Sequence, residues 1–504
     1  MNQLYFGDCL DILKDLRAKH PAGFIDLIYI DPPFNSKRNY NILFEDVNLS
    51  DVKAQKEAFA DTWSNISYLD TLAEIKEIDL DLFRILDTLN DIKISKSAIS
   101  YLTTMAIRIW YMHKVLKETG SFYLHCDPKM SHYLKIVCDL IFGEKNFRNE
   151  VIWDYTFRLM DLPQFYNRKH DVILFYAKSN KGFFNMPKTE WTREEIIRTR
   201  KQEIHKDENG NEWIWMPGGK GNSKNKKKFL SEIIAEGKAI SDVWQMPIIS
   251  SSAKERLGYP TQKPEELLER IIKASSNEGD LVADFFCGCG TTVAVSQRLN
   301  RKWLGVDISH LAIKLILKRL KDTHQERYKE ILADIDIDGF PRDIATAREL
   351  AHTERGRIKF QDWVVEVLIG GVSNPKKSGE GGEDGHFTFD ITNSKTGVGI
   401  VEVKSGNVPI SHLRSFITSV NQKKADMGVF VCFQDKITSG MKREAKAEGT
   451  LPNFLKVDKI QILSIEDLMN GKEVQLPALS TFKHFKSATK FTDNSIFENG
   501  ELFN

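Results

Sequence analysis

The sequence predicts an α/β protein, with a mostly parallel sheet in the first 350 residues and a smaller α/β domain after it. Two observations lead to this prediction. Short apolar segments alternate with segments of helical periodicity, which is the pattern of parallel strands joined by helical crossovers. In addition, a glycine turn at 287–290 joins a predicted strand to a predicted helix, which lets a ligand approach the backbone.

The first strands and helices follow one another in a clear order. Residues 24–30 are a β-branched and aromatic run, and two prolines end this strand directly after Asp31. Helical spacing then extends from about residue 50 to Gly120, where the glycine is expected to stop the last helix. The elements expected next are a strand at 121–125, a helix at 130–142 and strands at 150–155 and 171–176.

Apolar periodicity is lost between residues 179 and 259, which we interpret as an inserted recognition module. A βαβ unit follows, with a helix at 265–275 leading into a strand at 281–286, a helix to residue 299 and a strand at 303–306. A helix at about 311–323 and a segment at 334–351 come next, and a second α/β pattern begins at Phe360. We therefore expect domains at 1–350 and 351–504.

The composition is that of an ordinary globular protein, with 41% hydrophobic and 28% charged residues in 504. It excludes collagen-like, wholly disordered and disulfide-scaffold proteins. No apolar run approaches the roughly 20 residues that cross a bilayer and the chain starts without an export signal, so we expect no membrane partner and a cytoplasmic location. The six scattered cysteines are expected to be free thiols. A net charge of +1 means that any nucleic-acid surface must come from local segregation of charge.

The glycine turn has the features of a nucleoside site. Asp307 ends the next predicted strand about twenty residues on, where a carboxylate can accept hydrogen bonds from two ribose hydroxyls. The dinucleotide pattern G-x-G-x-x-G fails at Val293, and the P-loop pattern is absent. A mononucleoside-sized ligand without a pyrophosphate therefore fits better, and Cys287 and Cys289 are expected to pack rather than to bind metal.

The turn Asp31-Pro32-Pro33-Phe34 suits the binding of an amino group. The prolines fix the backbone, so that Asp31 and a backbone carbonyl can accept both hydrogens of an exocyclic amine. The nitrogen lone pair can then attack a sulfonium methyl group in line, while Phe34 offers an aromatic face to an extruded base. A cytosine C5 enzyme would need a cysteine beside a proline, and the sequence has no Pro-Cys dipeptide. We assign no chemistry to His125 and His170, because an amine polarised by a carboxylate requires no general base.

These motifs resemble those of the β group of S-adenosylmethionine-dependent DNA amino-methyltransferases, in which the catalytic half precedes the cofactor half. The resemblance covers residue 1 to about 350. It is carried by blocks that occur in the family's order, at 6–10, 31–34, 120–128, 142–146, 169–176, 259–264 and the glycine turn. The resemblance implies a seven-stranded Rossmann-like sheet, with residues 179–259 as the target-recognition region.

The resemblance also assigns roles to single residues. It implies that Asp31, Pro32, Pro33 and Phe34 hold the target base. It implies S-adenosylmethionine as cofactor, wrapped by Asp284, Phe286, Gly288 and Gly290, with Asp307 at the ribose, Asp8 at the adenine edge, and Thr261 and Lys263 at the methionine end. An aspartate at the start of the proline motif favours adenine N6 as the acceptor, with cytosine N4 as the alternative. Double-stranded DNA is the implied partner, dimers are frequent in the family, and a separate restriction subunit is a further partner that the resemblance allows.

The insertion contains the side chains that we expect to contact DNA. Its lysines are expected to bind phosphates, giving affinity that depends steeply on salt and little on base sequence. Its tryptophans are expected to pack or to stack. The residues concerned are Trp213, Trp215, Lys220, Lys224, Lys226, Lys227 and Lys228.

Asp384, Glu402 and Lys404 form a second candidate site in the tail. Glu402 and Lys404 are two apart on a predicted strand and therefore face the same side. Asp384 and Glu402 are expected to hold Mg²⁺ while Lys404 steadies a water or a phosphate, as phosphodiester hydrolysis requires. The segment is similar to restriction-endonuclease-like domains of the PD-(D/E)xK superfamily, but it departs from them at Glu383, where an apolar residue is usual.

The tail resemblance implies a single-chain restriction and modification protein that cuts DNA lacking its own mark. Two alternatives stay open from the sequence. In the first, the tail is a remnant that binds DNA or a partner without cutting. In the second, the tail is the sole catalytic part, and the first half is a DNA-binding platform that does not methylate.

Overall fold

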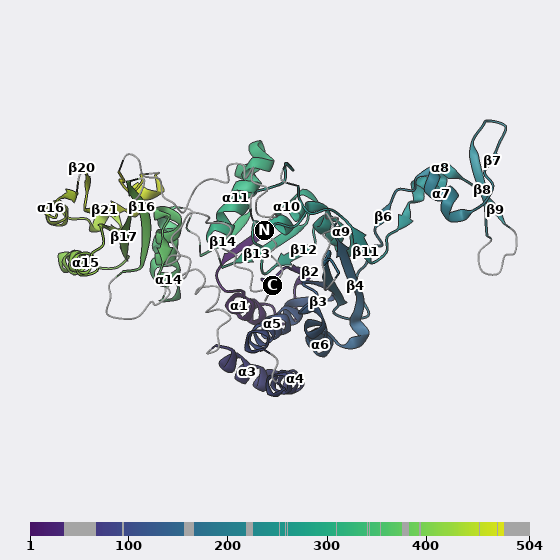
Figure 1. Cartoon of the computed structure of the whole chain (residues 1–504), viewed down its shortest axis with the longest axis horizontal. Coiled ribbons are helices and arrows are strands. Elements are labelled where there is room, and N and C mark those ends of the chain that lie inside the picture. The colour runs from purple at the N-terminus through teal and green to yellow at the C-terminus, as the bar shows by residue number, and fades with distance from the viewer. Residues whose placement is uncertain are drawn as a thin grey trace.

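The computed structural model describes residues 1–34, 67–92, 95–155, 166–217 and 225–477, except 251, 258, 260, 309, 340, 342, 353, 375–382, 393–394, 453 and 471. Its centre is a nine-stranded sheet, flanked at one end by residues 188–240 and at the other by the C-terminal unit (Figure 1). Within the described residues, no helix is long and apolar enough to span a membrane.

The central sheet is mostly parallel, as predicted. Its strands are, in order across the sheet, β11 (Val243–Gln245), β4 (Phe147–Asp154), β5 (His170–Ala177), β3 (Leu116–Cys126), β2 (Ile25–Ile30), β12 (Leu281–Asp284), β13 (Lys302–Asp307), β1 (Asn2–Phe6) and β14 (Ile335–Asp338). Of these nine, only β5 runs antiparallel to its neighbours. The expected count of seven strands is wrong, because the short strands β11 and β14 extend the two edges by pairing with β4 and β1.

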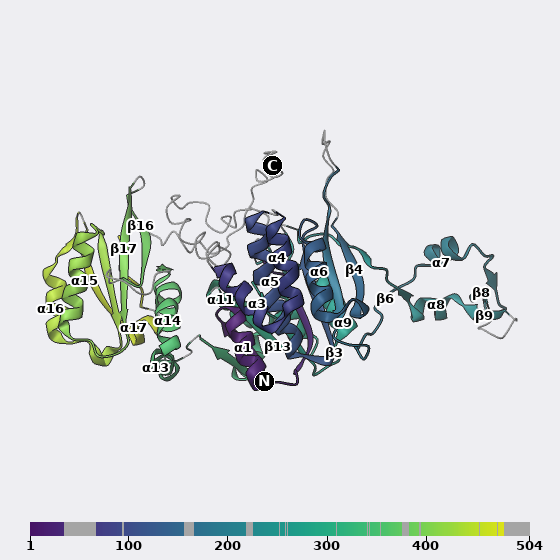
Figure 2. The same ribbon diagram turned by 90° about the horizontal axis from the view of Figure 1, so that it is seen from below.

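Helices cover both faces of this sheet. On one face α1 (Cys9–Lys19), α5 (Lys96–Val115) and α6 (Ser131–Phe142) share the core, and α3 (Ser67–Ile78) and α4 (Leu80–Asp91) pack against them (Figure 2). The other face carries α9 (Glu265–Ser275), α10 (Thr291–Arg298), α11 (His310–His324) and α12 (Tyr328–Ala333). Because β2 is buried on both faces, its sequence is almost continuously apolar.

The helix before β3 ends at Val115 and not at Gly120, so this prediction was wrong. Leu116 has extended torsion angles (φ −74°, ψ 140°) and begins the strand. The pairing of β2 with β3 shifts between Ile25–Leu116 and Leu27–Ser121. A Cβ atom on Gly120 would lie 2.6 Å from the Leu116 side chain, so this close approach and not a helix end favours glycine here.

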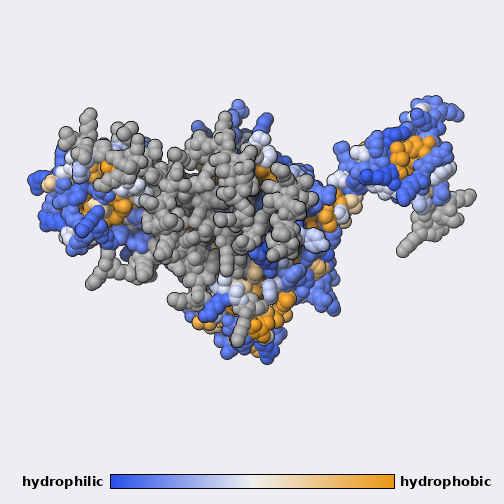
Figure 3. Space-filling model, in the orientation of Figure 1, coloured by the Kyte–Doolittle hydropathy of each residue, from blue (hydrophilic) through white to orange (hydrophobic). Residues whose placement is uncertain are grey.

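The predicted insertion forms a small unit that stands clear of the central sheet, with an apolar patch among hydrophilic residues on its visible face (Figure 3). Its elements are β6 (Lys188–Thr189), α7 (Arg193–Arg200), β7 (His205–Lys206), β8 (Glu212–Met216), β9 (Lys226–Phe229), α8 (Leu230–Glu236) and β10 (Lys238–Ala239). Their buried apolar side chains are Ile196, Ile214, Leu230 and Ile233. The chain rejoins the central sheet at β11, so the unit ends near residue 240 rather than at 259.

The C-terminal unit has its own five-stranded sheet, in the order β15 (Val372–Ser373), β16 (Gly385–Thr392), β17 (Lys395–Lys404), β18 (Met427–Cys432) and β21 (Ile460–Ser464). Its helices are α13 (Ile344–His352), α14 (Glu354–Asp362), the π-helical η4 (Trp363–Ile369), α15 (Ile410–Gln422), α16 (Ser439–Ala447) and α17 (Ile465–Met469). Ala347 and Ala351 of α13 are buried in this core, so α13, which begins at Ile344, already belongs to this unit, ahead of the expected boundary at 351.

Candidate functional site

Four aspartates lie at the carboxyl ends of adjacent parallel strands in the central sheet. Asp31 follows β2, Asp284 ends β12, Asp307 ends β13 and Asp8 follows β1. The backbone N–H of Gly7 donates to the Asp307 carbonyl at 3.0 Å, which links the last two ends. The carboxyl edge of a parallel sheet is where open α/β folds bind ligands. The structure therefore brings these four candidate residues to one edge of the sheet.

The glycine turn has the narrow backbone cradle that the sequence predicted. Gly288 (φ +48°) and Gly290 (φ +75°) both have left-handed torsion angles. A Cβ atom on Gly290 would lie 2.5 Å from Ile316 Cγ1. The N–H of Gly288 donates to Asp307 Oδ2 at 2.8 Å, which fixes the turn beside the expected ribose-binding carboxylate. Cys287 and Cys289 are buried, as packing residues should be.

Asp284 is a buried carboxyl group under this turn. It accepts hydrogen bonds from Thr292 Oγ1 at 2.6 Å and from the N–H of Phe286 at 3.0 Å. Burial raises the pKa of Asp284 to about 7; the two hydrogen bonds act against this rise, while the charges of Asp31 and Asp307 add to it. Asp284 thus titrates near neutral pH, and its two hydrogen bonds hold the residues on either side of the glycine turn.

Lys263 joins the two halves of the site. Its Nζ lies 2.5 Å from Asp31 Oδ2, and the two side chains are 12% and 15% exposed. The same Nζ lies 5.5 Å from the centre of the Phe34 ring. The sequence predicted Lys263 for the methionine end of a cofactor and did not predict its ion pair with the proposed base-site carboxylate. Such a pair joins positions 232 apart, and nothing in the local pattern indicates it.

The loop that carries Thr261 and Lys263 is held by Gln262. The side-chain oxygen of Gln262 accepts from the N–H of Leu257 at 2.8 Å, and its side-chain nitrogen donates to the carbonyl of Glu255. Thr261 is half-buried, as are Pro33, Phe34 and Phe286, while Pro32 is buried. Their positions at the sheet edge agree with the expectation, and their contacts with a ligand stay a prediction.

His125 lies directly behind the proline motif and is fully buried. Its Nε2 is 3.1 Å from Asp171 Oδ2, and its Nδ1 is 3.0 Å from the Tyr29 hydroxyl and 3.8 Å from Asp31 Oδ1. His125 therefore packs in the core and forms hydrogen bonds there. The sequence did not predict which partners it has, although His125 and Asp171 both fall within the blocks at 120–128 and 169–176.

Asp8 already has two partners in the protein. It caps α1 by accepting from the N–H of Leu10 at 2.9 Å, and both its oxygens lie 2.8 Å from Nη2 of the buried Arg108. These contacts leave fewer acceptor positions for the adenine edge that the sequence assigned to it. Arg108 was missed, although an arginine among the apolar residues of a buried helix is a signal for a buried partner.

Residues 25–318 match the family model N6_N4_Mtase, which is described as a DNA methylase. This match covers more than half of the chain. The chain belongs to this DNA methylase family. The methylase is 27% identical over 315 residues to DNA adenine methyltransferase YhdJ of Escherichia coli (strain K12), covering 62% of this chain and 81% of YhdJ.

Two further comparisons extend over most of the same region. The methylase is 29% identical over 329 residues to type II methyltransferase M.BamHI of Bacillus amyloliquefaciens, which covers 65% of this chain and 59% of M.BamHI. The alignment thus spans about three-fifths of that relative's length. The solved structure of PvuII DNA methyltransferase (cytosine-N4-specific) aligns with 67% of this chain and 95% of its own, with 14% identity and a TM-score of 0.37.

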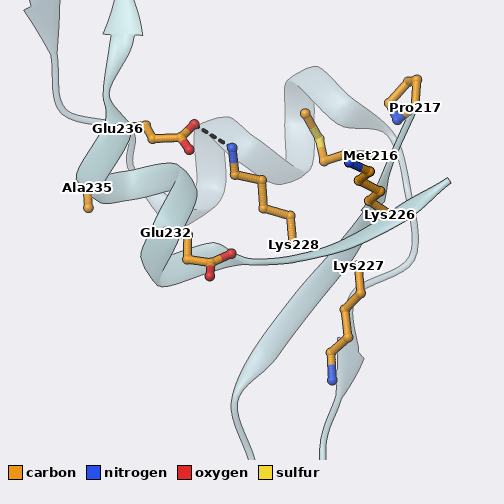
Figure 4. Close-up of a pocket in the computed structure, with 8 residues that line it drawn as sticks. All are labelled: Met216, Pro217, Lys226, Lys227, Lys228, Glu232, Ala235 and Glu236. Atoms are coloured by element: carbon orange, nitrogen blue, oxygen red, sulfur yellow. Dashed lines mark hydrogen bonds and ion pairs between the residues drawn. The ribbon is translucent and has the colours of Figure 1, made fainter. Parts of the chain in front are cut away.

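In the insertion of the methylase, several of the expected DNA contacts are occupied within the protein. Trp213 stacks on His205 with ring centres 4.5 Å apart, and Lys227 Nζ lies 4.9 Å from the Trp213 ring on β8. Lys228 and Glu236 both line a hollow of about 660 Å³, and their side chains pair at 2.5 Å (Figure 4). Trp215 is 43% exposed and Lys226 is exposed. Lys220 and Lys224 lie outside the described residues.

The tail candidates are close to one another, as the sequence predicted. Glu402 and Lys404 share one side of β17, with Lys404 Nζ 2.6 Å from Glu402 Oε1. Asp384 precedes the partner strand β16 and accepts from the N–H of Val403 at 2.7 Å. Burial raises the pKa of Glu402 to about 7, Lys404 acts against this rise, and Asp384 adds to it. The described residues contain no group of three or more His, Cys, Asp or Glu side chains that could hold a metal ion.

We expect Asp284 to make the stability of the methylase depend on pH. Between about pH 4 and 7 the folded protein keeps a proton on Asp284 that the unfolded chain has released, so the free energy of unfolding falls as the pH rises through this range. Asp284→Asn removes this term, which is on the order of 1.4 kcal/mol for each unit of pKa difference. In urea unfolding, the free energy of unfolding of Asp284→Asn relative to that of the wild type should therefore be higher at pH 8 than at pH 5. The surface variant Glu278→Gln is the control. An equal pH dependence in wild type and Asp284→Asn would contradict this assignment.

Proposed function

We propose that the chain transfers a methyl group from S-adenosylmethionine to N6 of adenine in double-stranded DNA, at a short target sequence and as the modification enzyme of a restriction-modification system. The observation that carries the proposal is the position of Asp31, which lies on the same sheet edge as the glycine cradle, one strand away. Membership of the DNA methylase family supports the reaction, and the printed name of the relative YhdJ supports adenine as the acceptor.

The residues at the glycine turn fit S-adenosylmethionine. The left-handed Gly288 and Gly290 let a nucleoside approach the backbone, and Asp307 is the carboxylate nearest the turn for the ribose hydroxyls. Phe286 and Asp284 would complete the cofactor side, with Asp8 at the adenine edge and Thr261 and Lys263 toward the methionine end. When bound, this cofactor supplies an electrophilic methyl group on a sulfonium.

On the acceptor side, Asp31 and a carbonyl of the proline motif would accept the two amino hydrogens of the base. Phe34 would stack on the extruded base, and Pro32 and Pro33 would hold these groups in place. These groups would hold the amine in line with the methyl group that the cofactor supplies, and the proton that the nitrogen gives up on transfer would pass to solvent. The reaction uses position and electrostatics and requires no covalent enzyme intermediate.

Within this proposal, residues 1–343 form the methylating domain and residues 188–240 position the DNA. The exposed Lys226 would contact phosphate and the exposed Trp215 would pack or stack, while Lys227, Lys228 and Trp213 would mainly maintain this surface. Lys220 and Lys224 are proposed phosphate contacts from the sequence. A second copy of the chain and a separate restriction subunit are partners that we propose from the resemblance alone.

Asp31→Asn should reduce methyl transfer by roughly 100-fold or more, because it removes the charge that polarises the amine. Cofactor affinity should change much less than the rate, since Lys263, which loses its ion pair with Asp31, still lies on the cofactor side. Asp26→Asn is a matched control, because Asp26 also belongs to the β2 segment and pairs with a lysine, Lys117, at 2.8 Å. Methyl transfer to plasmid DNA, followed by digestion to nucleosides, measures the outcome. N4-methylcytosine as the product would overturn the base assignment, and an inactive wild type would overturn the reaction.

Lys226→Ala should weaken the binding of all DNA sequences alike and lower the slope of log K against log salt by about 1. Lys228→Ala should change the slope less, because Glu236 already neutralises Lys228. Fluorescence anisotropy at several salt concentrations compares the two variants. A changed recognition sequence with an unchanged slope would show that Lys226 contacts bases instead.

As a second activity, we propose that the tail is a Mg²⁺-dependent endonuclease. The observation that favours it is the buried Oε2 of Glu402, which has no hydrogen-bond partner among the described residues and lies on the same side as Lys404. Asp384 and Glu402 supply the one or two carboxylates that Mg²⁺ usually takes from a protein, and water supplies its other ligands. Lys404 would hold the attacked phosphate.

Glu402→Gln and Asp384→Ala should abolish cleavage of unmethylated plasmid in Mg²⁺ or Mn²⁺. Wild-type cleavage should rise as the pH is raised through about 7, because the metal requires ionised Glu402. Glu444→Gln, which alters a surface ion pair of the same unit, serves as control. Intact plasmid with the wild type would leave the tail as a DNA-binding or partner-docking remnant, and equal cleavage of premethylated plasmid would rule out self-protection.

A further inference from the structure

The Asp31 carboxylate lies between a cation and an imidazole. Oδ2 is paired with Lys263 at 2.5 Å, and Oδ1 faces His125 Nδ1 at 3.8 Å. The other groups around the imidazole are Tyr29 of β2, Asp171 of β5, and the rings of Phe34 and Trp153 at 5.8 and 5.6 Å between ring centres. Oδ1 is therefore the oxygen of Asp31 that remains to accept a hydrogen from the target amine.

Asp171 determines which nitrogen of His125 carries the hydrogen. Burial acts to raise the pKa of Asp171, but the hydrogen bond with His125 and the positive charge of Lys263 lower it overall. Asp171 is therefore a carboxylate, which can only accept, so the hydrogen of the neutral imidazole is on Nε2. Nδ1 is then an acceptor for the Tyr29 hydroxyl, and burial keeps Tyr29 a neutral phenol by raising its pKa.

The position of this hydrogen matters for Asp31. With Nδ1 unprotonated, His125 donates nothing to Asp31, and Oδ1 keeps its acceptor capacity. With the hydrogen on Nδ1, the imidazole would donate to the Tyr29 oxygen, 3.0 Å away, and after a small approach also to Oδ1, 3.8 Å away, where it would compete with the amine of the base. In one tautomer of His125, Oδ1 of Asp31 is available to the target amine; in the other, the imidazole competes for it.

We propose that Asp171, acting through the Nε2–H tautomer of His125, keeps Asp31 Oδ1 available for the target amine. Asp171 and His125 are positioning residues, since they act on the base through Asp31. The inference rests on the proposed methylation of an exocyclic amine and adds two positioning residues to the base side of the site.

The direct test is Asp171→Asn. The asparagine amide keeps the shape and lacks the charge that holds the hydrogen on Nε2; with its NH2 group toward Nε2 it donates, which moves the imidazole hydrogen to Nδ1. The single-turnover rate of methyl transfer should fall at least about tenfold, while the affinities for DNA and for S-adenosylhomocysteine stay unchanged. Asp139→Asn is the matched control, because Asp139 is a partly buried carboxylate that binds Lys135 and Tyr176 away from the site. Equal losses in the two variants would overturn the inference.

A double-mutant cycle separates positioning from general support of the fold. His125→Gln keeps a donor for Asp171 and removes Nδ1, so Asp171→Asn should cause little further loss in this background. Additive losses would mean that Asp171 does not act through His125 and would overturn the inference.

Nitrogen-15 NMR of the imidazole side chains reads the tautomer without catalysis, and the signal missing in His125→Gln identifies His125. A hydrogen on Nδ1 in the wild type would overturn the inference whatever the activity. A hydrogen on Nε2 in a wild type that transfers no methyl group would instead contradict the proposed function. The two failures are therefore distinguishable.

Discussion

The backbone pairing of β2 with β12 is the interaction on which the arrangement of the methylase site depends. Leu27 lies opposite Val282 and Ile28 opposite Ala283, which joins parts of the chain about 255 positions apart. Because the strands are parallel, both chains emerge at the same edge, one into the proline motif and the other into the glycine turn. A shift of either strand by one residue would turn the side chains of that strand to the opposite face of the sheet. The site is thus a consequence of sheet registration.

Around this edge the protein holds several ionisable groups largely out of water. Asp31, Asp171 and Asp284 are largely buried, and they lie close enough to influence one another or the same neighbours. Lys263 and His125 offset part of this negative charge. Buried charges cost free energy unless they are paired, so removing one member affects the protonation of the others. The cluster responds to substitution as a unit.

Much of the fold could be predicted from periodicity because long buried elements impose it on the sequence. Helix α9 lies where it was predicted, at Glu265–Ser275, and strand β13 was predicted to within one residue. The short edge strands β11 and β14 were missed, since three or four residues paired on one side carry no distinctive pattern. Gly120 was misinterpreted because a glycine that ends a helix and one that permits a close contact look alike in sequence. The site residues were recognisable as motifs, but their mutual contacts, such as Lys263 with Asp31, depend on distant pairing.

Residues 191–236 contribute their buried apolar side chains to a cluster of their own and not to the clusters beneath the central sheet. The consequence is evolutionary. Substitutions in this segment affect the packing of its own small core, so the segment can diverge or be exchanged between homologues without altering the packing around the site residues. Under the proposed function, a lineage could acquire a new DNA target while inheriting its catalytic edge unchanged.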